Sequence, residues 1–241
     1  MYDNKNTKIS IIIPIFNEEK TVEKLISLVE QVELPYEKEI ILIDDGSADK
    51  SKEIINQYRA RHKTIFLEEN RGKGFAIRTG FKNATGDIVA FTDADTIVPP
   101  DWLTKIIASL NQPGISFVYS GYKVSDGWLP YRLHVNLVLP FIILFQHLIG
   151  LPFAPGQNTA FWKKLGLKVG GYPVNFKIAE DLEMARRIKS VGRIVYRSDN
   201  FVTSSGRRGM EGWPLLFRIT HFYFVYMFTR QVKDLTFPDF R

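Results

Sequence analysis

The first half of the chain alternates short apolar runs with segments of helical periodicity, and this pattern constrains the fold most. Residues 9–13 and 39–43 are rich in isoleucine, as expected of strands buried on both faces. Similar runs follow at residues 64–67 and 88–91, and each run precedes apolar residues at helical spacing. Alternating strands and helices build a mostly parallel sheet. The sequence therefore predicts an α/β fold with four strand–helix units in residues 9–110.

The composition fits a folded domain and excludes several classes of protein. The 241 residues contain no cysteine, which excludes disulfide scaffolds, thiolate zinc sites and cysteine nucleophiles. Lysine and arginine number 32 against 26 acidic residues, a net charge of +6 that suits a phosphate-bearing partner. Residues 1–6 are polar, so we expect no secretory signal. No internal repeat or low-complexity linker divides the chain, which favours a single domain over residues 1–241.

The second half contains two strongly apolar segments. Residues 133–153 are interrupted by polar residues and prolines, and the uninterrupted stretch 137–145 is too short for a bilayer span of about 20 residues. Residues 213–228 are aromatic but contain Arg218 and His221, which argues against spanning. We therefore expect an apolar helical C-terminal elaboration that is either buried in the core or lies in a membrane interface.

Two carboxylates follow the run at 88–91, namely Asp93 and Asp95. Such a pair at the carboxyl end of a buried strand can share a divalent cation and leave ligand positions for a diphosphate. A turn or a helix cap explains Asp95 or Asp101 equally well without a metal.

Polar residues also end the first two predicted strands. Asp44 and Asp45 either form an Asx-turn or accept hydrogen bonds from the base or ribose of a nucleotide. Phe16 offers an aromatic face and Glu18 an acceptor for sugar hydroxyls, whereas Asn17 is also a good helix cap. Acidic clusters at three successive strand ends favour a ligand site at this edge of the sheet.

Three further candidates lie outside the strand ends. Lys73, in the glycine-containing segment 71–74, is suited to phosphate oxygens, although neither a P-loop nor a dinucleotide fingerprint is present. Asp181 is a candidate general base, or else an acidic residue that stabilises a helix N-terminus. Arg207 and Arg208 form either a mobile clamp on a diphosphate or a solvated basic turn.

Taken together, these motifs resemble family 2 glycosyltransferases of the GT-A fold, in particular dolichol-phosphate mannose and glucose synthases. The resemblance covers about residues 8–200. The matching elements, in chain order, are residues 10–18, 43–47, 70–74, 93–95, 156–161, 170–172 and 180–181.

The resemblance implies roles for individual residues. A nucleotide-sugar pocket would be lined by Pro14, Phe16, Glu18, Asp44, Asp45, Lys73, Asp93, Arg207 and Arg208. Asp95, together with Asp93, would bind Mg²⁺ or Mn²⁺, and Asp181 would be the base of an inverting transfer. Residues 9–110 would then bind the nucleotide sugar, residues 111–205 would face the acceptor, and residues 206–241 would form a basic loop and an aromatic segment.

The implied function is transfer of a sugar from a UDP- or GDP-linked donor to a polyprenyl phosphate or another membrane-associated acceptor. We expect a cytoplasmic protein, peripheral at the inner face of the cell membrane, with no nucleic acid partner. Ile97 stands where dolichol-phosphate mannose synthases commonly have a glutamine, which leaves room for His221 or water as a metal ligand. The alternative hypothesis is an inactive, membrane-peripheral binding protein of the same fold; a sugar nucleotidyltransferase fits less well, because it needs a glycine-rich basic loop after the first strand.

Overall fold

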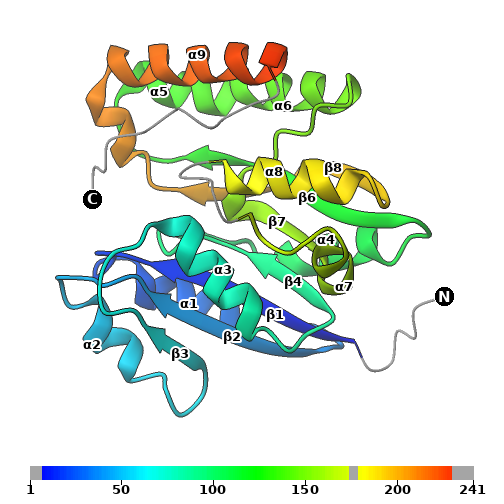
Figure 1. The fold of residues 1–241 in the computed structure, drawn as a ribbon. Coiled ribbons are helices and arrows are strands. Elements are labelled where there is room, and N and C mark those ends of the chain that lie inside the picture. Colours follow the sequence, from blue (N-terminus) through cyan, green and yellow to red (C-terminus); the bar gives the residue numbers. More distant parts are fainter. Residues whose placement is uncertain (1–6, 174–178, 230–241) are drawn as a thin grey trace.

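The computed structural model describes residues 7–173 and 179–229, which form one mixed sheet covered by helices (Figure 1). The sheet has eight strands in the order β3-β2-β1-β4-β7-β6-β8-β5. The strands are β1 (Lys8–Ile15), β2 (Glu37–Asp44), β3 (Lys63–Phe66), β4 (Ile88–Phe91), β5 (Thr96–Ile97), β6 (Ile115–Val124), β7 (Thr159–Trp162) and β8 (Arg193–Ser204). The predicted α/β class is confirmed.

The four strands expected from the sequence lie side by side and are parallel. β1 pairs with β2 and β4, and β2 pairs with β3, all in parallel. β7 is inserted antiparallel between β4 and β6, and β8 is parallel to β6. Because β7 is antiparallel to both β4 and β6, β6 and β8 run in the same direction as β1. Their carboxyl ends therefore reach the same edge of the sheet.

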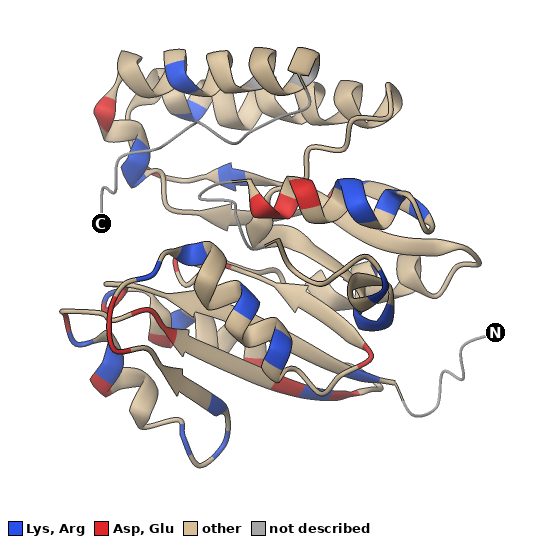
Figure 2. Ribbon diagram, in the orientation of Figure 1, with Lys and Arg blue, Asp and Glu red and all other residues tan. Residues whose placement is uncertain are grey.

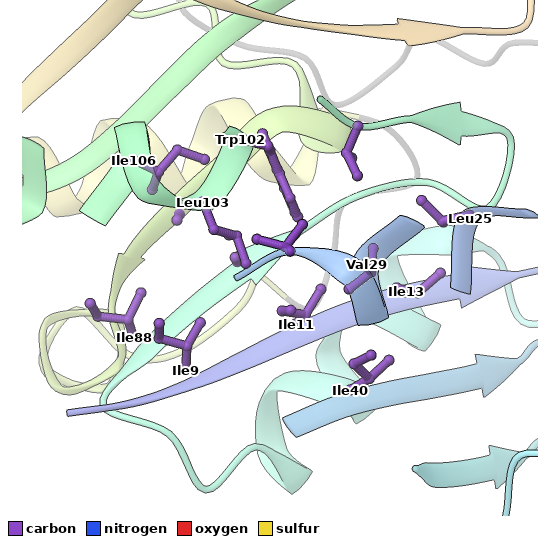
Figure 3. Close-up of a cluster of buried hydrophobic side chains, with 14 of the residues drawn as sticks. Ile9, Ile11, Ile13, Leu25, Val29, Ile40, Ile88, Trp102, Leu103 and Ile106 are labelled. Carbon is purple, nitrogen blue, oxygen red and sulfur yellow. The ribbon is translucent and has the colours of Figure 1, made fainter. Parts of the chain in front are cut away.

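Helices cover both faces of the sheet, as strands buried on both faces require. Within the described residues these helices are α1 (Val22–Gln31), α2 (Ser51–Asn56), α3 (Lys73–Asn83), α4 (Trp102–Leu110), α7 (Lys163–Lys168) and α8 (Glu180–Lys189). On one face, alternate residues of β1 pack against α1 and α4 (Figure 3). On the other, Ile12, Ile41 and Ile43 pack against α3 and belong to the same apolar cluster as the buried side of α8.

Asn158 joins three segments in the interior, beside the start of β7. Its Oδ1 accepts a hydrogen bond from Trp102 Nε1 at 2.9 Å, and its Nδ2 donates to the carbonyl oxygens of Gly121 and Asn200 at 2.9 and 2.7 Å. The residue is fully buried. A truncated side chain would leave these three groups without their partner.

We therefore expect Asn158→Ala to lower the free energy of unfolding by about 3 kcal/mol or more. Chemical denaturation measures this change. Asn56→Ala, on the exposed side of α2, is the matched control and should change stability by less than about 0.5 kcal/mol. Equal effects of the two variants would contradict the structural role of Asn158.

A separate layer of helices lies outside the second half of the sheet (Figure 1). It consists of Leu129–Leu148 and α9 (Trp213–Thr229), and we call it the outer helical layer. The first helix is continuous through α5 (Leu129–Leu133), a π-helical turn at His134–Val138 and α6 (Leu139–Leu148). The Asn136 carboxamide exchanges two hydrogen bonds with the backbone of Val124, which ties this turn to the end of β6.

The first helix extends well beyond the uninterrupted apolar stretch at residues 137–145. The π-helical turn lets the helix continue past His134, Asn136 and Pro140, so it reaches 20 residues with a mean hydropathy of 1.3. By length and composition alone it is the one helix in the described residues that could cross a membrane. Its inner side, however, packs on the sheet through Val135, Leu139 and Ile143.

Candidate active site

The carboxyl ends of β1, β4 and β8 surround a polar cavity of about 150 Å³. Crevices at this edge of a parallel sheet are the usual ligand sites of α/β proteins. The cavity is lined by Pro14, Phe16, Glu18, Lys73, Asp93, Ala94, Asp95, Tyr122, Tyr131, Gln157, Ser204, Ser205, Arg207 and Arg208. Eight of the predicted site residues are in this set, although they are spread over almost 200 positions of the chain.

Lys73 and Asp93 form an ion pair inside the cavity. The Lys73 Nζ atom lies 2.7 and 2.8 Å from the two carboxylate oxygens of Asp93. Gly72, with φ of 88°, turns the chain just before α3 and so allows Lys73 to begin that helix at the cavity edge. Burial would lower the pKa of Lys73, but the charges of Asp93, Asp181 and Glu180 raise it overall. Lys73 therefore stays positively charged, as binding of a phosphate requires.

Arg207 bridges two carboxylates that come from different strand ends. Its Nη2 donates to Glu18 Oε1 and also lies 3.3 Å from Asp95 Oδ2. Burial, together with the negative charges of Asp93 and Glu18, raises the pKa of Asp95 to about 6, although Arg207 and Arg208 oppose this rise. The cavity thus brings negative charge together at Asp95 and binds a cationic group there.

Asp44 and Asp45 are buried and hold loops beside the cavity. Asp44 Oδ2 accepts a hydrogen bond from the Ser47 amide, three residues further along the chain, at 3.2 Å and so holds the turn that follows β2. Asp45 Oδ1 accepts one from the Arg71 amide at 3.0 Å and so ties the loop before α3 to the end of β2. Neither residue belongs to the cavity lining in the described part of the chain.

Asp181 lies behind the cavity at the start of α8. Its Oδ1 accepts a hydrogen bond from the Tyr172 hydroxyl, and its Oδ2 lies so close to Gly156 that a Cβ there would meet it at 1.9 Å. Burial raises the pKa of Asp181, and the positive charge of Lys73 opposes this rise. A carboxylate held in this way suits a general base, since its orientation is fixed and its proton affinity is increased.

Glu180 is buried beside Asp181 and has a strongly shifted pKa. Burial, and next the negative charge of Asp181, raise it from 4.5 to about 8. The folded protein therefore keeps a proton on Glu180 that the unfolded chain releases between these two values, so stability falls as the pH rises through this window.

We expect the free energy of unfolding to fall by roughly 2–4 kcal/mol between about pH 5 and about pH 8 because of Glu180 alone. Glu180→Gln removes the titrating group and should flatten the profile. Chemical denaturation of both proteins across this range measures the difference. Parallel profiles for the two proteins would show that Glu180 has an ordinary pKa.

Some residues of the site were not predicted from the sequence. Tyr131, from the outer helical layer, and Tyr122, from the end of β6, line the cavity, as do Gln157, Ser204 and Ser205. The region around Gln157 is part of the family pattern, which was a usable signal. No sequence motif marks Tyr131, because its place in the cavity depends on how α5 packs against the sheet.

The residues around Asp95 offer part of a ligand set for a divalent cation. Asp93, Asp95 and Glu18 supply carboxylate oxygens, which Mg²⁺ and Mn²⁺ prefer, and the Arg207 guanidinium already binds there as a cation. No group of three or more acidic or histidine side chains among the described residues has the spacing of a complete ligand set. His221 is exposed on α9 and Ile97 lies on β5, and neither lines the cavity.

Comparison with known proteins gives a family match over most of the chain. Residues 10–169 match the family model described as glycosyl transferase family 2. A poly-beta-1,6-N-acetyl-D-glucosamine synthase of Staphylococcus epidermidis is 43% identical over 95 residues, which cover 39% of this chain and 23% of that protein. An undecaprenyl-phosphate 4-deoxy-4-formamido-L-arabinose transferase of Photorhabdus laumondii is 37% identical over 111 residues, covering 44% of this chain and 34% of that protein. The matched segments thus span about a third or less of these curated relatives.

Solved structures share the fold over nearly the whole chain. A mannosyltransferase from Pyrobaculum calidifontis, in complex with GDP-Man and Mn²⁺, has a TM-score of 0.74 at 21% identity and covers 95% of this chain and 66% of that one. S. aureus TarS in complex with UDP-GlcNAc has a TM-score of 0.63 at 22% identity, with 95% and 68% covered.

Proposed function

The chain belongs to glycosyl transferase family 2, and on that premise we propose that it transfers a sugar from a UDP- or GDP-linked donor to a membrane-associated acceptor, with Mg²⁺ or Mn²⁺ as cofactor. One observation carries the proposal. Glu18, Lys73, Asp95 and Arg207, from four separate parts of the sequence, meet in one cavity at the carboxyl edge of the sheet. A nucleoside diphosphate needs cations for its phosphates and acceptors for its hydroxyl groups, and this cavity offers both.

Each side of the cavity has a role in this proposal. Pro14, Phe16, Glu18 and the loops held by Asp44 and Asp45 face the nucleoside. Lys73, Arg207 and Arg208 bind the diphosphate. Asp95 and Asp93 hold the metal ion, which supplies charge stabilisation for the departing nucleoside diphosphate. GDP-Man with Mn²⁺ in one solved relative, and UDP-GlcNAc in another, support a donor of this class.

Asp181 is the base in this proposal. It accepts the proton of the acceptor hydroxyl while that oxygen attacks the anomeric carbon, and direct displacement inverts the configuration there. Tyr172 and Gly156 keep the Asp181 carboxylate in one orientation. A phosphate acceptor that is already ionised has no proton to give to a base. The dependence of the transfer rate on Asp181 therefore also indicates the chemical class of the acceptor.

The outer helical layer supports a membrane-associated acceptor. Its outward side exposes, among others, Phe141, Phe145, Trp213, Phe217, Phe224 and Phe228. Between α6 and α9 lies an apolar groove of about 620 Å³. Figure 2 shows long stretches of this layer without charged residues. Exposed apolar surface of this extent marks an interaction site, and undecaprenyl phosphate in the name of one relative points to lipid.

We expect replacement of two exposed aromatic residues to detach the protein from lipid. Phe141 and Phe145 are 73% and 57% exposed, so serine at both positions should leave the fold intact. Loss of both from a bilayer interface should weaken vesicle binding about 100-fold or more. Flotation with vesicles of anionic phospholipid measures this, and Leu167→Ser, 57% exposed on α7, is the control. Equal flotation of all three proteins would contradict the proposed lipid-binding surface.

A transfer assay tests the proposed function itself. The protein is incubated with Mn²⁺ and a panel of UDP- and GDP-sugars, in separate reactions with an ionised acceptor, undecaprenyl phosphate in detergent, and with hydroxyl acceptors from membrane and glycan extracts. We expect one donor to release its nucleoside diphosphate in step with formation of a glycolipid. Donor binding without any turnover, with this lipid or with membrane and glycan extracts, would favour an inactive binding protein.

A further inference from the structure

The guanidinium of Arg207 lies where the proposed function needs a metal ion. Its Nη2 atom contacts both Glu18 and Asp95, and the Arg207 side chain is only 33% exposed. Both carboxylates are more deeply buried than their partner. Removal of the Arg207 charge from either carboxylate would cost free energy, because an uncompensated buried charge is strongly destabilising.

The backbone near Arg207 is held firmly, so its side chain is the part that can move. The Gly206 amide donates to Asp126 Oδ1 at 2.6 Å, and Gly209 lies against the ring of Tyr131. A Cβ at Gly206 would meet the Asp126 carbonyl oxygen at 1.9 Å. Rotation about the side-chain bonds of Arg207 can redirect the guanidinium within the cavity while the loop stays in place.

A divalent ion at Asp95 and the guanidinium of Arg207 repel each other when both bind the same carboxylate. The diphosphate of a donor removes this conflict, since its oxygens can ligate the metal and also accept hydrogen bonds from the displaced guanidinium.

We propose that Arg207 occupies the cation position of the free protein, so that metal and nucleoside diphosphate bind together and each strengthens binding of the other. This inference rests on the proposed function. It assigns Arg207 a second role beyond contact with the diphosphate, namely coupling of metal binding to nucleotide binding. By linkage, the factor by which UDP or GDP tightens Mn²⁺ binding equals the factor by which Mn²⁺ tightens nucleotide binding.

The test measures Mn²⁺ binding rather than turnover, with free Mn²⁺ counted by electron paramagnetic resonance. Wild type, Arg207→Ala and Arg207→Gln are titrated with Mn²⁺ alone and then in the presence of UDP or GDP. Arg208→Ala is the matched control, because it removes the same charge from the same cavity while the ion pairs of Arg207 with Glu18 and Asp95 stay in place. Thermal unfolding establishes that each variant is folded.

We expect both Arg207 variants to bind Mn²⁺ alone about tenfold or more tightly than wild type, whereas Arg208→Ala changes the affinity less. The gain in Mn²⁺ affinity on adding nucleotide should be smaller in the Arg207 variants than in wild type. Equal affinity of wild type and the Arg207 variants for Mn²⁺ alone, with nucleotide-dependent binding intact, would overturn the inference and leave the proposed function standing. Absence of Mn²⁺ binding in every protein, even with UDP and GDP present, would overturn both.

Discussion

Asp95→Ala is expected to lower kcat/KM for sugar transfer by about 10³-fold or more. The carboxylate of Asp95 lies near Asp93 and Glu18 in the cavity, and without it the proposed metal ion would lose its principal protein ligand. Charge on the departing diphosphate would then develop without its main stabilisation.

The same substitution should leave the protein folded. The pKa of Asp95 is raised to about 6, chiefly by burial, which means that the folded state disfavours its charge. Removal of that charge should therefore not lower the melting temperature. Asp101→Ala is the control, since Asp101 is an exposed carboxylate in a surface ion pair with Lys105. Full activity of Asp95→Ala, or equal loss in both variants, would contradict a metal site at Asp95.

For transfer to a hydroxyl acceptor, Asp181→Asn is expected to lower kcat by about 10²–10⁴-fold while nucleotide affinity stays unchanged. Asparagine keeps the size of the side chain and an oxygen that can accept the Tyr172 hydrogen bond, but it cannot take a proton. Asp181 does not line the described cavity, so donor binding should not depend on it. Steady-state kinetics together with calorimetric titration of the nucleotide separate the two quantities.

Glu180→Gln is the matched control for this prediction. Glu180 has the same kind of buried surroundings, and with a pKa of about 8 it is mostly protonated at neutral pH. Glutamine there resembles the protonated acid, so the rate should change by less than about tenfold. An unchanged rate in Asp181→Asn would contradict the role of a base and indicate an acceptor that is already ionised, such as a phosphate.

Much of the fold could be predicted because the sequence patterns that indicate its strands and helices are local. Runs such as Ile9–Ile13 are strands buried on both faces, and polar residues at their carboxyl ends fall at one edge of the sheet wherever the strands are parallel. The residues after β1 and β4 that the sequence singled out do line the cavity, whereas Asp44 and Asp45 after β2 hold loops beside it.

The features that escaped prediction depend on contacts between distant residues. The antiparallel insertion of β7 is determined by its pairing with β4 and β6, and residues 159–162 alone do not specify it. Polar residues and prolines interrupt the apolar stretch 133–153 in the sequence, but a π-helical turn, tied to Val124 by the Asn136 hydrogen bonds, keeps the helix continuous. The Arg207 contact to Glu18 spans 189 positions, a pairing that no local pattern specifies.

Calorimetric titration with UDP and with GDP, each with and without Mn²⁺, tests the central claim most directly. The account predicts that one of the two nucleotides binds with a dissociation constant between about 1 μM and 1 mM, the usual range for enzyme substrates, and that binding requires both Mn²⁺ and Asp95. Failure of both nucleotides to bind the folded wild-type protein in the presence of Mn²⁺ would contradict it.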